Sequence, residues 1–184
     1  MEILIPASAA VALAALIAGA FAWRRRRQLG PRLRRTLVLN SDARVRSVVI
    51  PDGLDGHIQI DHVLKTHAGF VVVDVVRASG AVFGGDQIDE WTAMSAGRSH
   101  KFRNPLATNN VRVLAVRALV PGVPVHGLVV LLGAVTFPKG TPARTVTLET
   151  LPAALAALPH RPPNPAVNVD DAWYGLTAAS AAAA

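Results

Sequence analysis

Two strand-like runs joined by a glycine turn constrain the fold of this 184-residue chain more than any other feature. The runs are His57–Thr66 and Phe70–Val76, and Gly69 between them can adopt a positive φ angle. Phe70–Val73 is apolar at every position, which is typical of a strand buried on both faces. The sequence therefore predicts an antiparallel hairpin at the centre of a sheet.

Two aspartates occupy equivalent positions on the two arms of this hairpin. Asp61 and Asp74 are equally far from its midpoint, so we expect them to lie opposite each other. The Cβ atoms of directly opposed residues are about 5 Å apart. Two carboxylates this close favour a divalent cation between them, and Mg²⁺ is the natural candidate. The alternative is two unrelated aspartates on a half-solvated face.

The other patterns predict a mixed α/β fold, in which helices flank a mixed sheet. Gly30-Pro31 is expected to interrupt any helix, and residues 86–103 to be irregular, with Trp91 as their one large anchor. Residues 178–184 are expected to be disordered. Further strands are expected at Arg44–Ile50, Ala81–Phe83, Val125–Leu132 and Arg144–Leu148, and helices at Arg32–Leu39, Asn104–Leu119 and Thr150–Leu158.

The N-terminal segment predicts a membrane anchor. Ile3–Trp23 contains 21 residues without a charge, and Arg24, Arg25, Arg26 and Arg27 follow at once. A helix of this length spans about 30 Å, which is the thickness of a bilayer core. A cleaved signal peptide is the alternative, but no basic residue precedes the run. By the positive-inside rule we expect a single-pass protein of the inner (cytoplasmic) membrane, with its N-terminus outside and its domain in the cytoplasm.

The net charge of +7 is concentrated in one short segment. Residues 24–35 hold seven arginines, and the chain after residue 35 contains twelve basic and eleven acidic residues. The domain itself is therefore nearly neutral, and Arg24–Arg27 are expected to contact anionic lipid, with DNA as the alternative. The absence of cysteine excludes disulfides, thiolate zinc sites and a cysteine nucleophile. The abundance of Ala and Arg hints at a bacterial, GC-rich genome.

These patterns divide the chain into four segments. We expect a transmembrane anchor at 1–23, a basic linker at 24–43, the folded domain at 44–158 and a Pro/Ala-rich tail at 159–184. His57, His62 and His67 lie near the hairpin, but strand alternation puts His62 on the opposite face from the other two and from Asp61. A zinc site there is disfavoured.

A series of short motifs then points to a known family. The chain contains Ile60-Asp61-His62-Val63, Gly69–Val76, Gly80–Gly84, Trp91, Phe102, Asn104-Pro105-Leu106, Asn109 and Val125–Val130 in one order. This series resembles the nuclease-related domain (NERD) family over roughly residues 44–158. The family is similar to the PD-(D/E)xK nucleases, so the resemblance implies a restriction-endonuclease-like fold and Mg²⁺-dependent phosphodiester hydrolysis.

The resemblance also implies which residues act and which have been replaced. Asp61 and Asp74 match the metal-binding, catalytic acidic positions, whereas Val76 stands at the lysine position and Thr108 at the glutamine position. No acidic residue lies between Gln28 and Ser41 for the early helix. Valine can neither orient water nor stabilise charge. Replacement cations could come from Lys65, Lys101 or Arg103, and the candidate binding residues are Gln59, Asn104, Thr108 and Asn109.

Three functions remain open from the sequence. The first is a membrane-anchored, catalytically degenerate nuclease-like module, or pseudoenzyme, that binds nucleic acid or protein. The second is an active Mg²⁺-dependent nuclease that uses Asp61 and Asp74 with a displaced cation. The third is a structural membrane protein that binds another protein.

Overall fold

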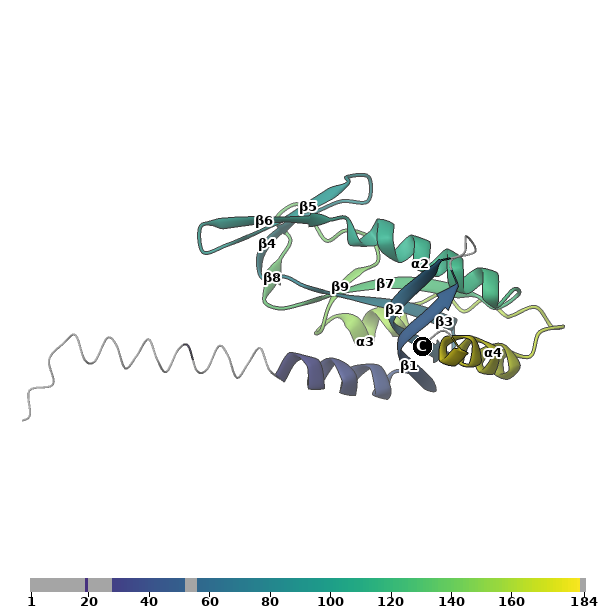
Figure 1. The fold of residues 1–184 in the computed structure, drawn as a ribbon. Helices are drawn as coiled ribbons and strands as arrows, with labels where there is room; N and C mark the ends of the chain where they lie inside the picture. The colour runs from purple at the N-terminus through teal and green to yellow at the C-terminus, as the bar shows by residue number, and fades with distance from the viewer. Residues whose placement is uncertain (1–18, 20–27, 52–55, 183–184) are drawn as a thin grey trace, which may run out of the picture.

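The structure is a computed structural model that describes residues 19, 28–51 and 56–182. Its larger sheet has five strands in the order β1-β2-β3-β7-β9 (Figure 1). The central strand β3 is antiparallel to β2 and parallel to β7, which confirms the mixed α/β fold and the central hairpin. The strands are β1 Ala43–Pro51, β2 His57–Thr66, β3 Gly69–Arg77, β7 Val125–Leu132 and β9 Thr145–Thr147.

A second sheet of four strands, in the order β6-β5-β4-β8, was not expected from the sequence. Its strands are β4 Gly80–Phe83, β5 Glu90–Ser95, β6 Arg98–Arg103 and β8 Val135–Thr136. The prediction that residues 86–103 are irregular is therefore wrong. Five of the six β6 side chains are exposed and only Phe102 is half-buried, so this strand carries no apolar alternation to reveal it. Trp91 is fully buried against Phe102, as expected for the anchor of this segment.

Helix α2 (Pro105–Leu119) begins and ends where the sequence predicts. The Asn104 side chain caps it by accepting the Leu106 N–H at 2.9 Å, and Pro105 follows at the first helical position. Helix α3 (Leu151–Ala156) is shorter than predicted, and Thr150 makes no side-chain cap hydrogen bond.

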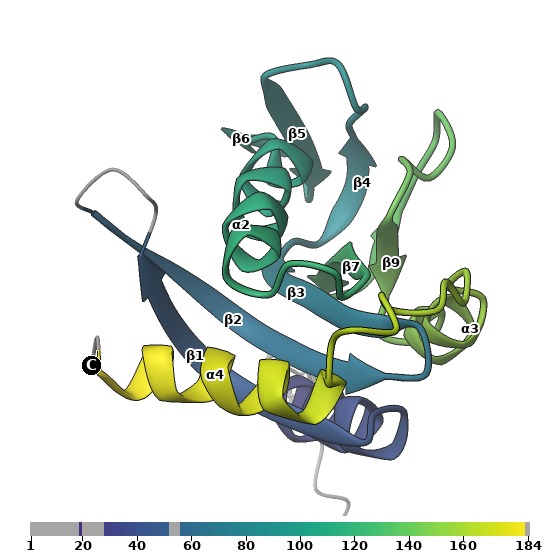
Figure 2. The same ribbon diagram turned by 90° about the vertical axis from the view of Figure 1, so that its right-hand side faces the viewer.

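Helix α4 (Val169–Ala182) is a correction to the sequence prediction, because residues 178–182 were expected to be disordered. Its Leu176 is buried and its Trp173 packs edge-on against Phe70, with ring centroids 5.4 Å apart. Figure 2 shows α4 lying across β1 and β2, on the sheet face that α2 also covers. Tertiary contacts therefore stabilise an alanine-rich segment that has little pattern of its own.

The opposite face of the sheet is covered by the helical residues 28–39 and by α3 (Figure 1). The expected break at Gly30-Pro31 is wrong, since residues 28–39 are helical throughout. The proline costs no hydrogen bond within this stretch, because its missing N–H would point to the carbonyl of residue 27. Leu33 and Leu37 are buried with Leu64 and Val71, so the packed body includes residues before 44.

Among residues 19, 28–51 and 56–182, no helix is both long and apolar enough to cross a membrane. The predicted span Ile3–Trp23 lies outside the described residues except for Gly19, and Arg24–Arg27 lie outside them entirely. The transmembrane anchor and its arginine cluster therefore stay predictions.

Candidate functional site

The site lies where β2 separates from β3. The two strands pair from Thr66 with Gly69 to His62 with Val73, which is the predicted register. Beyond that point the ladder ends, and Asp61 Oδ2 accepts a hydrogen bond from the Val75 N–H at 2.8 Å. Where the two strands separate, the Asp61 carboxylate thus accepts the Val75 N–H hydrogen bond in place of a backbone carbonyl.

Strand alternation is interrupted at the same level. Ile60 and Val63 pack in one cluster with Phe70, although regular alternation would put residues three positions apart on opposite faces of the strand. The neighbouring strand β1 has Ser47 at this level, with a φ of 53°. Strict alternation predicts that Gln59, Asp61 and Lys65 share one face. This is wrong for Lys65, which pairs with Asp170 of α4, whereas Asp61 lies on the side of the helical residues 28–39.

Asp74 is the buried carboxylate of the site, with only 3% of its surface exposed. Arg112 Nη1 lies 2.8 Å from Asp74 Oδ1, in a close ion pair. The Asn109 amide donates to Asp74 Oδ2 at 3.0 Å and approaches the Val72 carbonyl at 3.3 Å. Burial raises the pKa of Asp74 above its ordinary value, and Asn109 and Arg112 offset part of that effect.

Helix α2 can position both donors because it approaches the sheet closely. Gly127 of β7 faces Asn109, and a Cβ atom at Gly127 would lie 2.1 Å from Asn109 Oδ1. Asn109 and Arg112 are three residues apart and therefore lie on the same side of the helix. Sequence reasoning missed Arg112, although its position one turn after Thr108 was a usable signal.

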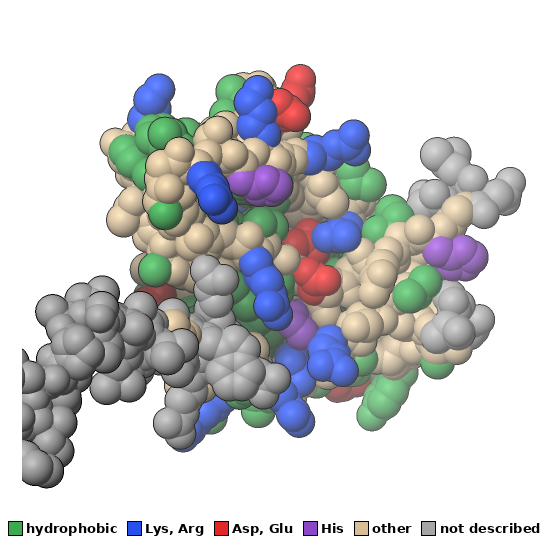
Figure 3. Space-filling view, turned by 60° about the vertical axis from the view of Figure 1, so that its left-hand side comes forward, with side chains coloured by type: hydrophobic (Ala, Val, Ile, Leu, Met, Phe, Trp, Pro, Cys, Tyr) green, Lys and Arg blue, Asp and Glu red, His purple; other side chains and the backbone are tan. Residues whose placement is uncertain are grey.

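His62 is a second residue of the site that the sequence reasoning set aside. It is 8% exposed, and its Nδ1 atom has no hydrogen-bond partner among the described residues. Burial and the charge of Arg44 lower the pKa of His62 to about 4. The prediction that His62 and Asp61 lie on opposite faces is wrong, because both line one cavity of about 900 Å³. In Figure 3 acidic side chains lie at the base of a hollow with Lys and Arg side chains around it.

The structure brings only some of the predicted site residues together. Asn109 donates a hydrogen bond to Asp74, whereas Asp61 accepts one from the Val75 N–H and lines a cavity on the other face of the sheet, although its charge still contributes to raising the pKa of Asp74. The two aspartates are therefore not the directly opposed pair that the sequence predicts, because the β2–β3 ladder ends at His62 with Val73. Gln59 is exposed and pairs across with Val49 of β1. Asn104 is buried and bonds the carbonyls of the loop before β5. Thr108 is half-buried, without a side-chain hydrogen bond to the described residues.

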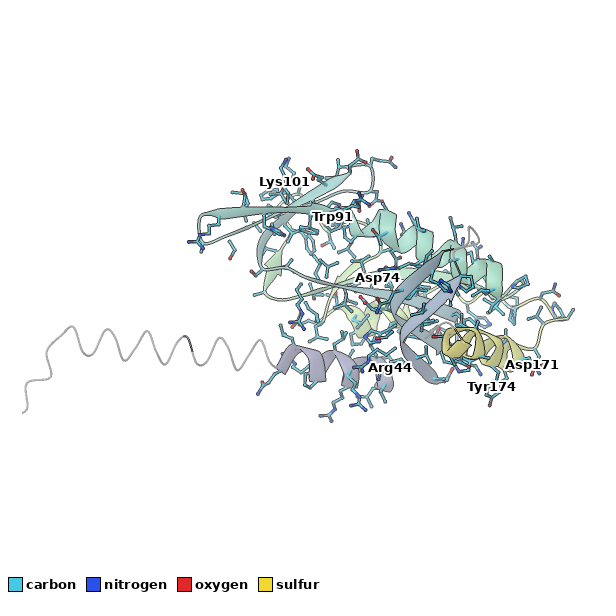
Figure 4. The ribbon with its side chains drawn as sticks, in the orientation of Figure 1. Arg44, Asp74, Trp91, Lys101, Asp171 and Tyr174 are labelled. Atoms are coloured by element: carbon cyan, nitrogen blue, oxygen red, sulfur yellow. The ribbon has the colours of Figure 1, made fainter. Side chains whose placement is uncertain are left out.

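The expected replacement cations do not reach Asp74. Lys65 pairs with Asp170 of α4, and Lys101 lies 3.5 Å from Glu90 on the second sheet. Figure 4 shows Lys101 at the outer side of that sheet and Asp74 in the central one. Arg103 is exposed on β6. Among the described residues, the cation in contact with Asp74 is Arg112.

The donor set does not fit a hard divalent cation. Mg²⁺ requires oxygen ligands in near-octahedral geometry and keeps several waters. Here Asp74 is almost fully buried and held by Arg112 and Asn109, while one Asp61 oxygen is held by a backbone N–H. The part of the chain that the structure describes contains no group of three or more His, Cys, Asp or Glu side chains able to hold a metal.

A comparison with known families gives one match. A family model described as NERD, nuclease-related domain, matches residues 23–132. The match covers the helical residues 28–39, the hairpin, the second sheet apart from β8, and α2 and β7. No curated protein and no solved structure is detectably similar to the chain.

Proposed function

The chain belongs to the nuclease-related domain family, and on this premise we propose that it is a membrane-anchored, catalytically inactive nuclease-like module that binds nucleic acid without cleaving it. The observation that carries the loss of catalysis is the Asp74–Arg112 ion pair. In a metal-dependent nuclease this carboxylate would hold the metal on the scissile phosphate. In this chain a guanidinium, a group that stays protonated, is paired with the Asp74 carboxylate in place of a metal.

Two further features support this proposal. Val76, at the position that the resemblance assigns to lysine, is half-buried and packs against an apolar cluster that contains Trp91. It has no group that could orient water or stabilise developing charge. Arg112 does not replace the lysine as a base, because a guanidinium group does not release its proton in proteins.

The anchoring part of the proposal rests on the sequence. Ile3–Trp23 is long enough to span a bilayer, and Arg24–Arg27 would hold the following domain on the cytoplasmic side, against anionic lipid. Nucleic acid is proposed as the partner because the family is nuclease-related and because basic side chains surround the hollow seen in Figure 3. The anchor would keep this binding at the membrane surface.

An active nuclease is the second candidate, because Asp61 still lines the cavity and its charge still contributes to raising the pKa of Asp74. It would depend on Mg²⁺ displacing Arg112 from Asp74. Cleavage in this case would need both carboxylates.

The experiment compares the full chain, purified in an uncharged detergent, with the Asp61→Asn/Asp74→Asn double variant. Single- and double-stranded DNA and RNA are incubated with each protein in Mg²⁺ or Mn²⁺. We expect no cleavage above the double variant, together with binding that weakens as salt rises. Metal-dependent cleavage that the double variant loses would establish the active nuclease instead. The absence of both cleavage and binding would leave a module that binds protein.

A further inference from the structure

A cavity of about 900 Å³ lies between the helical residues 28–39 and strands β1, β2 and β3. It is on the opposite face of the sheet from α2, which carries Arg112 and Asn109. Five arginines line it: Arg34 and Arg35 from the helical stretch, Arg44 and Arg46 from β1, and Arg77 from β3. Figure 4 shows Arg44 close to the end of the 28–39 stretch.

The positive charge of this cavity is not neutralised by the described residues. None of the five arginines forms an ion pair or side-chain hydrogen bond with a residue in 28–51 or 56–182. Asp61 is the acidic residue in the lining, and one of its oxygens is already held by the Val75 N–H. Burial lowers the pKa of Arg44, and the neighbouring charges of Arg34 and Arg46 lower it further.

His62 supplies an independent indication of a ligand. Its side chain lines the cavity, is 8% exposed, and leaves Nδ1 without a partner among the described residues. A buried polar atom without a partner costs about 1–3 kcal/mol, so such atoms are rare unless something binds them.

Size and lining restrict the class of ligand. Pockets of 300–1,000 Å³ take ligands of about drug or nucleotide size. Apolar side chains, among them Leu33, Val75 and Leu132, share the lining with the arginines. Arginine pairs bidentately with phosphate oxygens, and several arginines around one cavity match a dianionic phosphate better than a single carboxylate.

We infer that this cavity binds a small ligand with a terminal phosphate or diphosphate, through Arg44, Arg46 and the other arginines of its lining. The inference concerns the same hollow whose basic side chains support the proposed nucleic-acid binding, and it rests on that proposal only in sharing this hollow, since it names a terminal phosphate as the group bound. A nucleoside diphosphate and a lipid phosphate headgroup share this chemistry, so the test separates the two sources.

Binding is measured by isothermal titration calorimetry on the full chain in an uncharged detergent at low salt, with pyrophosphate and ADP as probes. We expect saturable binding with one site per chain. Arg44→Gln and Arg46→Gln should each weaken it by about tenfold or more, since each removes a charge-assisted hydrogen bond. Arg98→Gln is the matched control, because Arg98 is exposed on β6 and does not line the cavity. Thermal melting checks that each variant is folded.

The lipid arm uses vesicles of phosphatidylcholine with and without phosphatidic acid. Recruitment that requires phosphatidic acid and Arg44, without ADP binding, would support the cavity and assign the phosphate to a lipid. No saturable binding of any phosphate probe would overturn the inference, and so would equal weakening by Arg98→Gln and Arg44→Gln. Arg44-dependent binding of oligonucleotides that lack a terminal phosphate, without binding of ADP, pyrophosphate or phosphatidic acid, would also overturn it. The cleavage assay with the Asp61→Asn/Asp74→Asn variant reports on the proposed function separately.

Discussion

At the scale of single residues, the Asp74–Arg112 pair determines how the centre of the site is stabilised. Asp74 is 3% exposed, so its charge has little access to water. A buried carboxylate without a partner is costly, whereas a buried pair can be nearly neutral in its net effect. Asn109 adds a hydrogen bond to the second oxygen. The pair therefore matters most when one partner is removed.

Arg112→Ala is expected to lower the free energy of unfolding by about 3–5 kcal/mol, because it leaves the Asp74 charge buried and unpaired. The Arg112→Ala/Asp74→Asn double variant should recover part of this loss. Urea unfolding at pH 7 measures both. Arg103→Ala, at an exposed position on β6, is the control and should change stability by less than about 0.5 kcal/mol. Equal losses in the single and double variants would contradict the role assigned to the pair.

His62 predicts how stability depends on pH. Its pKa in the folded chain is about 4, below its ordinary value of 6.5, so the unfolded chain binds the proton more readily between these values. The stability from a neutral His62 is therefore complete above about pH 6.5 and is lost as the pH falls toward 4. The full effect is on the order of 3 kcal/mol.

The measurement is the free energy of unfolding at pH 7 and at pH 4.5, in the wild type and in His62→Gln. The variant should lose less stability on acidification than the wild type. The raised pKa of Asp74 acts in the opposite direction in both proteins, so the difference between them isolates His62. His100→Gln, which changes an exposed histidine of β6, should behave as the wild type does. Identical pH slopes in all three would contradict the assignment.

The sequence located some of these residues and missed others for a physical reason. The register of the hairpin could be predicted because it follows from the turn, but the strands separate just before Asp61 and Asp74, so the two are not directly opposed. The position of Arg112 one turn after Thr108 was a usable signal, but its contact with Asp74 and the burial of His62 depend on how α2 and residues 28–39 dock on the sheet. The interruption at Asp61 and Ser47 also defeats strict alternation, on which the placement of Lys65 and His62 relative to Asp61 relied.

At the scale of elements, the close approach of α2 to β7 is what brings Asn109 to Asp74. Gly127→Ala should destabilise the protein by about 1–3 kcal/mol, because the new methyl group would overlap Asn109 and Val113. Gly175→Ala is the matched control: nothing lies within 4 Å of its Cβ position, and alanine favours helix α4 by about 0.5–1 kcal/mol. Thermal or urea unfolding shows whether each variant is less or more stable than the wild type. A Gly127→Ala variant as stable as the wild type would contradict the close packing of α2 on β7.

Helix α4 illustrates an element whose position depends on distant partners. Leu176 is 1% exposed and packs with residues of the hairpin and α2, whereas Tyr174 is 70% exposed. Leu176→Ala should therefore cost about 2–5 kcal/mol, and Tyr174→Ala should cost little. Urea unfolding followed by tryptophan fluorescence checks this, because Trp173 reports on the same helix. Equal, small effects would mean that α4 is not docked on the sheet.

At the scale of the whole molecule, the absence of cysteine allows the proposed membrane topology to be tested directly. Glu2→Cys and Ser99→Cys place one thiol before the apolar run and one on β6. On intact bacterial cells, a membrane-impermeant maleimide should label Glu2→Cys, and it should label Ser99→Cys only after the membrane is permeabilised. Labelling of Ser99→Cys on intact cells, with loss of the N-terminal cysteine, would instead indicate a cleaved signal peptide.

The sequence by itself determined the local elements: the central hairpin and its register, the start and end of α2, and the buried anchor Trp91. These follow from side-chain periodicity, caps and turn residues, which act over a few positions. Only the tertiary structure decided that Arg112 meets Asp74, that five arginines and His62 line one cavity, and that α4 docks. Such contacts join residues far apart in the chain, and their geometry depends on how whole elements pack.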